Sequence, residues 1–566
     1  MSQGLKRGLT HYGDPDFSRY LRYSFAKSMG YSGKLLARPV VGIAYPSSGF
    51  NNCHRHFPEL LEAVKRGVLA AGGLPLEFST ISLGEVFLNP TSLMFRNLMS
   101  MDVEEMIRAQ PMDSVVLMGG CDKTVPAQLM GAASAGLPAV QLVAGPMLTG
   151  SHRGERLGAC TDCRRFWAQF RAGTLSKTEI DGIEDRLAVT AGTCPVMGTA
   201  STMACLAETL GITLPGTAAI PAVHADRLRA AEATGELAVQ LTENGITPDR
   251  LITPRSIENA LRVLLALGGS TNAIIHLTAI AGRLGVKISL QTLNRLSDAT
   301  PVLVNLKPTG SHYMENFFAA GGVGAVLQEL KPLLHLDCPT ITGQTLGERL
   351  GQASEFVDRS IIHPFDKPVE SVGGLVALFG SLAPQGAILK RSAADQRLFE
   401  QKGRAVVFTS LEDLSNRIDD PDLEVTENDF LVLQNAGPRS GTGMPESGYL
   451  PIPSKLSKAG VQDMVRISDA RMSGTAFGTV VLHVTPEAAT GGPLGLVRNG
   501  DEIELSVKNR RLELLVPDET LSRRRTEAVN VSASQSIDAS RGYAKLYMEH
   551  VLQADEGCDF DFLKSP

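Results

Sequence analysis

Aromatic residues, long apolar runs and positive charge are all scarce in this 566-residue chain. Phe, Tyr and Trp make up 5% of the residues, and there is one Trp, so platforms for stacking nucleic-acid bases are not expected. The formal net charge of −6 argues against broad binding to nucleic-acid phosphates. No run of about 18 apolar residues is present, so we expect no membrane span. Nucleic acid and membrane are therefore not the expected partners.

The first residues also lack the apolar core of a secretory signal. We therefore expect a cytoplasmic protein, in which structural disulfides are rare. Its eight cysteines should be reduced or bind metal. Hydrophobic residues make up 43% of the chain and charged residues 20%, which is ordinary for a soluble globular enzyme. The 56 glycines and 31 prolines are spread along the chain and indicate many tight loops.

The first two thirds of the chain alternate short apolar runs with amphipathic stretches. Residues 40–44, 114–118 and 139–143 are predicted to be buried strands that end in loops. Helices are expected between them, one with Pro58 in its first turn and one that begins near Pro126. This order predicts parallel α/β layers. Ligands of such sheets gather beyond the carboxyl ends of the strands.

The pattern changes after about residue 370, where short apolar runs are separated by turn residues. Apolar and polar residues alternate over 503–507 and again over 512–516, which is a hairpin signal. We expect a mainly β, barrel-like fold in this part of the chain. The predicted organisation is an α/β domain at residues 1–370 followed by a β-barrel-like domain at residues 371–566.

Three cysteines lie far apart in the chain, each in a loop that contains polar residues and glycine. They are Cys53, Cys121 and Cys194. Cys121 follows a glycine pair, which allows the backbone to approach a ligand closely, and it precedes Asp122 and Lys123. Thiolate suits an iron–sulfur cluster, whereas carboxylate suits Mg²⁺. The combination is more typical of a metal-assisted lyase than of a redox carrier.

Structural interpretations of these cysteines remain open at this point. Cys194 precedes Pro-Val-Met, which would suit a core, and residues 121–123 could form a turn with a surface ion pair. Cys160 and Cys163 form a CxxC pair. Structural zinc normally needs a second pair of ligands, and the chain contains no second CxxC. We interpret this pair as two reduced thiols in a loop and assign it no role.

Two glutamates and one serine lie in segments that are typical of loops. Glu85 and Glu446 could add oxygen ligands to a hard-metal site, although a single carboxylate of this kind is usually solvated. The glycine and proline around Glu446 place it in a loop, where functional residues concentrate. Ser473 lacks the Gly-x-Ser-x-Gly elbow of hydrolases. Taken alone, it would be a turn residue.

The whole chain resembles the dihydroxy-acid dehydratase and phosphogluconate dehydratase family. Besides the three cysteine loops, the resemblance rests on motifs at residues 267–272, 382–387, 435–438, 443–446 and 468–474. Members of this family use a [2Fe–2S] cluster and Mg²⁺ to convert 2,3-dihydroxy acids into 2-keto-3-deoxy acids. Residues 81–85, 468–473, 541–547 and 550–557 are more similar to the sugar-acid branch, the dehydratases of the L-arabinonate and D-xylonate type.

The resemblance also implies roles for particular residues. The implied ligands of the cluster are Cys53, Cys121 and Cys194. The implied ligands of Mg²⁺ are Glu85, Asp122, Glu446 and a carbamylated Lys123. Ser473 would be the base. Apart from the resemblance, an aldonate would need partners for its extra hydroxyls. Three residues could supply them or could equally cap a helix: Thr199, Ser201 and Thr202. The family further implies a homodimer or homotetramer.

The function expected from these features is a hydro-lyase that dehydrates an aldonate. The alternative within the family is the dihydroxy-acid dehydratase of branched-chain amino-acid biosynthesis, whose substrate would need an apolar pocket. A phosphogluconate dehydratase would need a cationic phosphate clamp, which the sequence does not locate. An electron-transfer or regulatory iron–sulfur protein is a different class. In such a protein Glu85, Glu446 and Ser473 would have no use.

Overall fold

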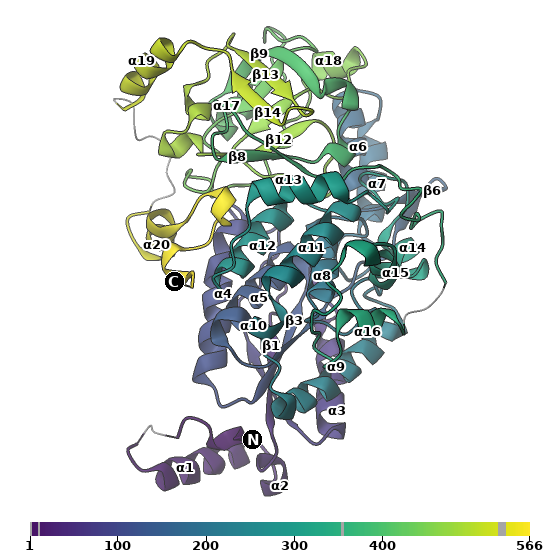
Figure 1. Cartoon of the computed structure of the whole chain (residues 1–566), viewed down its shortest axis with the longest axis vertical. Helices are drawn as coiled ribbons and strands as arrows, with labels where there is room; N and C mark the ends of the chain where they lie inside the picture. Colours follow the sequence, from purple (N-terminus) through teal and green to yellow (C-terminus); the bar gives the residue numbers. More distant parts are fainter. Residues whose placement is uncertain (1–2, 10–11, 353–355, 530–538, 566) are drawn as a thin grey trace.

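The computed structural model describes residues 3–9, 12–352, 356–529 and 539–565. Two parts are stacked along the long axis of the molecule (Figure 1). The N-terminal part is built on a four-stranded sheet, and the C-terminal part is built on an eight-stranded sheet. No helix among the described residues is both long enough and apolar enough to cross a membrane.

The N-terminal sheet is parallel throughout. Its strands, in sheet order, are β2 (Leu74–Ser79), β1 (Val40–Tyr45), β3 (Ser114–Gly119) and β4 (Ala139–Val143). The strands predicted over residues 40–44, 114–118 and 139–143 are confirmed. Their apolar runs are continuous because both faces of a parallel sheet are covered.

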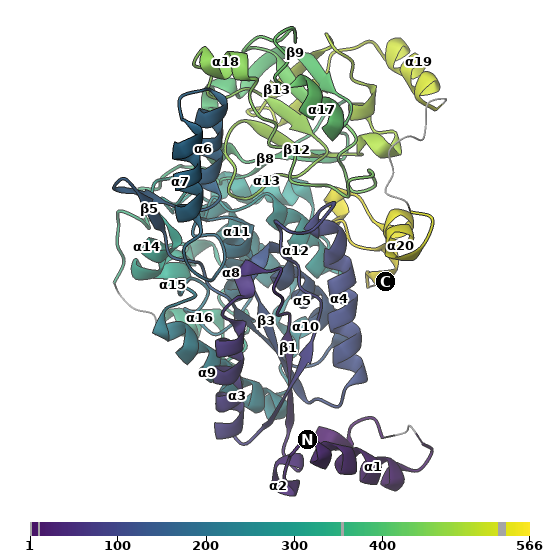
Figure 2. The ribbon, with the colours of Figure 1, turned by 180° about the vertical axis from the view of Figure 1, so that it is seen from behind.

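Helices cover both faces of this sheet (Figures 1 and 2). The helices that position the site are α3 (Phe57–Ala70), α4 (Ser92–Ala109), α5 (Cys121–Ala135), α6 (Thr161–Arg171), α8 (Thr199–Thr209), α9 (Ala225–Asn244) and α12 (Asn272–Gly282). Val41 and Val116 pack in one core cluster with residues of α3. Val40 and Val115 pack in another with residues of α4. This alternation follows from the two-residue period of a strand.

Helix α5 begins directly at the end of β3, so the prediction that it begins near Pro126 is wrong. Pro126 lies inside the helix, where its ring removes one backbone donor but leaves the remaining turns intact. Gly120 precedes the helix as its N-cap. A Cβ atom there would lie 2.5 Å from the Cβ of Ala144, so glycine is required. The chain therefore turns from strand to helix without a longer loop, and Cys121 becomes the first helical residue.

The C-terminal sheet contains parallel and antiparallel neighbours. Its strands, in sheet order, are β14 (Arg511–Leu514), β13 (Glu502–Ser506), β9 (Glu400–Phe408), β10 (Phe430–Leu433), β11 (Arg466–Ser468), β12 (Val480–Thr485), β8 (Gly386–Leu389) and β7 (Val376–Leu378). A bridge between Phe379 and Arg511 joins the two ends of the sheet, which is nearly closed. The predicted hairpin and barrel-like architecture are confirmed, whereas the domain boundary after residue 370 stays a prediction.

The end of the chain returns to the N-terminal part. Helix α20 (Gly542–His550) lies beside α4 in both views (Figures 1 and 2). The Tyr543 hydroxyl donates a hydrogen bond to the carbonyl of Met94. Arg283 of the N-terminal part forms a fully buried ion pair of 2.6 Å with Asp559. The last segment therefore ties the two parts together.

His54 connects two loops at the carboxyl edge of the N-terminal sheet. Its Nδ1 lies 2.7 Å from the carbonyl oxygen of Pro46, and its Nε2 lies 3.1 Å from the amide nitrogen of Gly120. These partners require a proton on Nδ1 and a free lone pair on Nε2, so the ring must be neutral. Burial lowers the pKa of His54 to about 4. The neutral ring thus holds the backbone that leads into Cys121.

Acid should therefore destabilise the protein through His54. An unfolded histidine takes up its proton near pH 6.5, whereas the folded one does so only near pH 4. Between these values the unfolded state binds more protons, so stability falls as the pH falls, by on the order of 2 to 3 kcal/mol at pH 4.5. Urea denaturation at pH 7 and pH 4.5 measures this loss. His54→Gln should show a smaller loss, and an equal loss in both proteins would contradict the assignment.

Candidate active site

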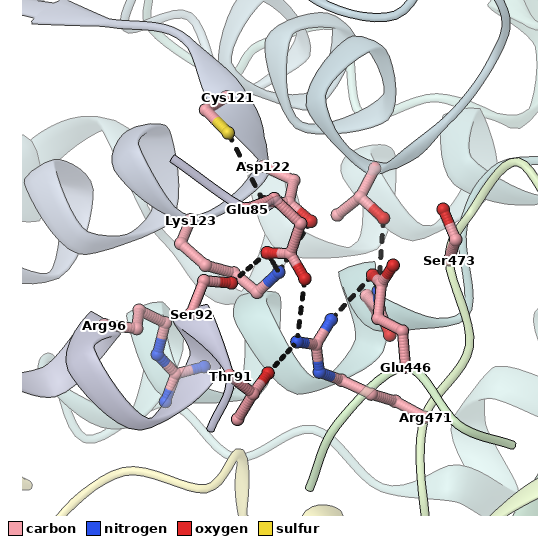
Figure 3. A network of polar contacts seen from close by, with 12 residues as sticks. Glu85, Thr91, Ser92, Arg96, Cys121, Asp122, Lys123, Glu446, Arg471 and Ser473 are labelled. Atoms are coloured by element: carbon pink, nitrogen blue, oxygen red, sulfur yellow. Dashed lines mark hydrogen bonds and ion pairs between the residues drawn. The ribbon is translucent and has the colours of Figure 1, made fainter. Parts of the chain in front are cut away.

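Three carboxylates converge where the two parts of the molecule meet (Figure 3). Glu85 comes from the segment between β2 and α4, Asp122 from the first turn of α5, and Glu446 from a loop between β10 and β11. One oxygen of each lies within 4.8 Å of the others. Oxygen ligands at about 2.1 Å from Mg²⁺ lie at most about 4.2 Å apart. A small inward movement would therefore let these residues, which the sequence singled out, bind one cation.

Two fully buried cations lie among these carboxylates. Lys123 Nζ is 2.8 Å from Glu85 Oε2 and 2.6 Å from Asp122 Oδ2. Arg471 Nη1 is 2.7 Å from Glu446 Oε1, and its Nη2 is 3.3 Å from Glu85 Oε1. Charges removed from water are stable only when they are paired. With all groups ionised, three carboxylates face two cations, so one negative charge is left over to attract a metal ion.

The pKa shifts of these groups follow from burial and from one another. Burial and the Glu85 carboxylate raise the pKa of Asp122 above its ordinary value. Burial also acts to raise the pKa of Glu85, but the Lys123 and Arg471 cations outweigh it and hold this pKa well below the usual range. Burial and Arg471 lower the pKa of Lys123, yet the three carboxylates shift it upward overall. Of these two carboxylates, Glu85 is thus the one whose anionic form is favoured.

Sequence reasoning gave no role to Arg471, Thr91 or Asn272, which complete this network. Arg471 Nη2 donates to Thr91 Oγ1 at 2.7 Å, and Asn272 Nδ2 lies 3.4 Å from Glu446 Oε1. The sequence contained a signal for two of these residues, because they lie within or close to motifs already identified. Arg471 precedes Ser473 by two positions, and Asn272 ends the motif that begins at residue 267. Both fix the direction in which Glu446 points.

Two of the predicted cluster ligands, Cys53 and Cys121, lie beside the carboxylates. Cys53 is in the short helix η2 (Asn52–His54), and Cys121 Sγ is 3.7 Å from Asp122 Oδ1. A hydrogen bond with the Cys121 thiol, together with burial, raises the pKa of Cys53. Cys121 has a left-handed φ of 59°. A bulky residue rarely adopts this conformation, and such strain concentrates at functional sites.

A small cavity of about 10 Å³ lies between the loops of Cys121 and Cys194. Its walls are Gly119, Gly120, Cys121, Val125, Val143, Ala144, Gly145, Pro146, Thr193, Ala200, Ser201, Ala204 and Ala218. Most of these residues are small, so the backbone stands close to the space it encloses. Cys121 adds a soft thiol to these walls, which is the donor type that iron–sulfur groups take.

Cys160 also belongs to this region. Its Sγ lies 3.1 Å from Cys194 Sγ, and Cys163 Sγ lies 2.7 Å from the carbonyl oxygen of Cys160. Both residues of the CxxC pair are free thiols. The interpretation of the pair as two thiols in a loop is therefore wrong in its placement, because Cys160 caps α6 and Cys163 lies inside it. The start of this helix brings Cys160 against Cys194, a predicted cluster ligand.

Ser473 lies in the loop between β11 and β12, next to the loop of Glu446. Ser447 and Met472 form a bridge between these two loops, and Figure 3 shows Ser473 beside Glu446. The Oγ of Ser473 is 2.8 Å from Thr475 Oγ1. The predicted base therefore lies next to one of the predicted metal ligands.

The three predicted hydroxyl partners of the substrate all lie in the first turn of α8. Thr199 Oγ1 is 2.8 Å from Ser270 Oγ, and Thr202 Oγ1 accepts a hydrogen bond from the Ser270 amide at 3.2 Å. Ser201 Oγ is 3.5 Å from the carbonyl oxygen of Cys194 and lines the cavity. Each hydroxyl thus has a partner in the protein, and a role toward substrate stays a prediction.

Removal of Arg471 should lower the free energy of unfolding, because the buried carboxylates lose a cation that pairs with them. Arg471→Met leaves Glu446 and Glu85 without the guanidinium, so we expect a loss of about 3 to 5 kcal/mol in the free energy of unfolding. Urea denaturation in the presence of EDTA measures it. A matched control is Arg511→Met, which removes a half-exposed partner of Glu513 and should cost about 1 kcal/mol or less. Equal losses in the two variants would refute this account of the site.

Two family models cover most of the chain. The dihydroxy-acid/6-phosphogluconate dehydratase N-terminal model matches residues 38–349, and the C-terminal model of the same family matches residues 360–558. The matched segments include both parts of the structure and every residue of the candidate site.

Several relatives align over nearly their whole length. L-arabinonate dehydratase of Rhizobium leguminosarum bv. trifolii is 47% identical over 541 residues, which are 95% of this chain and 93% of the relative. The 6-deoxy-6-sulfo-D-gluconate dehydratase of Pseudomonas putida is 45% identical over 94% of this chain and 92% of its own. A dihydroxy-acid dehydratase of Caldicellulosiruptor bescii is 37% identical over 96% and 98%.

All these names denote dehydratases, which are hydro-lyases. The matches extend over both parts of the molecule and include the three carboxylates that converge in the structure. This chain is therefore an enzyme and belongs to the dihydroxy-acid/6-phosphogluconate dehydratase family.

Proposed function

We propose that this enzyme removes water from a 2,3-dihydroxy sugar acid, an aldonate, and releases a 2-keto-3-deoxy acid. The observation that carries the proposal is the convergence of Glu85, Asp122 and Glu446 beside the cysteine loops and Ser473. The sugar-acid dehydratases are also more similar to this chain than the dihydroxy-acid dehydratase is, at 47% and 45% against 37% identity.

The site would hold two metal groups. The proposed ligands of a [2Fe–2S] cluster are Cys53, Cys121 and Cys194. The proposed ligands of Mg²⁺ are Glu85, Asp122, Glu446 and carbamylated Lys123. When bound, these groups supply Lewis acidity toward the oxygens of the substrate. An ammonium group has donors only, so Lys123 could ligate a metal only after its neutral amine adds CO₂, which gives an anionic carbamate and releases one proton.

Ser473 is the proposed base. Its Oγ, as the alkoxide, would take the proton from C2. The C3 hydroxyl would leave as water after it receives this proton from the serine, and the resulting enol would ketonise. A serine hydroxyl is too weak an acid to be deprotonated near neutral pH unless its surroundings stabilise the anion. The hydrogen bond of 2.8 Å to Thr475 Oγ1 limits the orientations that Ser473 Oγ can adopt.

The expected oligomeric state and location do not affect this chemistry. A homodimer or homotetramer and a cytoplasmic location stay predictions. Light scattering of the purified protein would measure the first.

Anaerobically purified enzyme should contain about two irons and two sulfides per chain and should turn over a pentonate or hexonate. A panel of aldonates plus 2,3-dihydroxyisovalerate, assayed for 2-keto acid, measures this activity. Removal of divalent ions with EDTA should abolish turnover, and Mg²⁺ should restore it. Turnover on 2,3-dihydroxyisovalerate alone would move the enzyme to the amino-acid branch of the family.

Replacement of the base should affect turnover far more than substrate binding. For Ser473→Ala we expect kcat to fall by about 100-fold or more, the usual contribution of a general base, with little change in KM. The iron content should stay the same. Ser454→Ala, which alters a serine bonded to Asp419, serves as the control. A Ser473→Ala enzyme that keeps most of its kcat would rule out this role.

A further inference from the structure

Lys390 is a fully buried lysine with a single weak partner. It directly follows β8 and has 0% exposure. Its Nζ donates one hydrogen bond, to the carbonyl oxygen of Gly474 at 3.3 Å, which is long for a bond of this type. Lys123, the buried lysine at the carboxylates, has instead two carboxylate partners. A buried cation without an anion costs several kcal/mol, so stability does not explain Lys390.

The one acceptor of Lys390 belongs to the loop of the proposed base, because Gly474 directly follows Ser473. The other side of this loop packs on the first turn of α8. A Cβ atom on Gly474 would lie 2.6 Å from the Thr199 amide nitrogen, so the two segments are in close contact. The loop is therefore held between the Lys390 side chain and the N-terminus of α8.

Both of these neighbours are electrically positive. The N-terminus of a helix such as α8 carries a partial positive charge, and Lys390 carries a full charge when it is protonated. Burial lowers the pKa of Lys390 to about 7, and no charged or titratable group among the described residues opposes or adds to that effect. An anion close to Lys390 would favour its charged form again. The loop of Ser473 thus lies where a negative charge is stabilised.

We propose that Lys390 is a positioning residue for Ser473. Its ammonium group fixes the Gly474 peptide and keeps a positive charge near the anionic form of the serine, without contact with the substrate. This inference rests on the proposed function, in which Ser473 is the base. It explains why an unpaired cation is kept in the interior at this point of the fold.

The test compares Lys390→Met with Lys390→Gln in the cluster-containing, Mg²⁺-loaded enzyme. Met is similar in length and removes the charge, whereas Gln also removes the charge but can still donate to the Gly474 carbonyl. In both variants the alkaline rise of kcat should move up by about 1 to 2 pH units, since loss of a nearby cation raises the pKa of the serine. At neutral pH kcat should fall about 10- to 100-fold, with KM changed less than about threefold.

The thermal midpoint distinguishes a positioning role of Lys390 from a purely structural one. Replacement of an unpaired buried charge by an apolar side chain should leave the thermal midpoint unchanged or raise it, and iron and sulfide content should equal that of the wild type. Lys65→Met is the control, because it removes a lysine that pairs with Glu77 on α3 and β2. It should leave the pH profile of kcat unchanged.

The outcomes separate this inference from the proposed function. If the wild type turns over no acid in the panel, the proposed function fails. If the wild type is active but both Lys390 variants keep its kcat and pH profile, the inference about Lys390 is overturned. A lower thermal midpoint without a shift of the pH profile would also overturn it, since that result describes a structural residue. If Lys390→Met does not fold, the pH profile of Lys390→Gln decides.

Discussion

Compensation of buried carboxylate charge is the constraint on which the rest of this structure depends. Glu85 and Asp122 belong to the N-terminal part, whereas Glu446 and Arg471 belong to the C-terminal part. The guanidinium of Arg471 contacts glutamates from both parts. Since charges removed from water must be paired, the two parts can close on each other only in the arrangement that completes this network. The active site and the interface between the parts are therefore one structure.

The carboxyl edge of the N-terminal sheet brings the second set of ligands to the same place. Strand β3 passes directly into α5, so the Cys121 thiol and the Asp122 carboxylate are adjacent in sequence, and Cys121 Sγ lies 3.7 Å from Asp122 Oδ1. Small residues keep a cavity open beside the cysteine loops, while the carboxylates face Lys123 and Arg471. Soft and hard donors are thus separated by a single peptide, which suits two different metal groups.

Two features of this arrangement destabilise the folded protein locally. Cys121 adopts a strained left-handed conformation, and Lys390 is a buried cation with one carbonyl partner. Both local costs occur beside residues that carry the proposed chemistry, since Cys121 precedes Asp122 and Lys390 contacts the Ser473 loop. Departures from good packing and pairing at a functional site are expected where activity requires them.

The sequence by itself determined three strands of the parallel sheet and the C-terminal hairpin, but it did not predict β2. Continuous apolar runs and alternating patterns are local properties, and the motifs carry their ligands within a few residues. The sequence pattern misplaced the start of α5, because Pro126 is a typical first-turn residue. The turn into the helix is instead made at Gly120, where only glycine fits beside Ala144. The tertiary structure alone decided the contacts of Arg471, Cys160 and Lys390. Arg471 and Glu85 are 386 positions apart, and no local pattern encodes a pairing that exists only after the two parts have closed on buried charge.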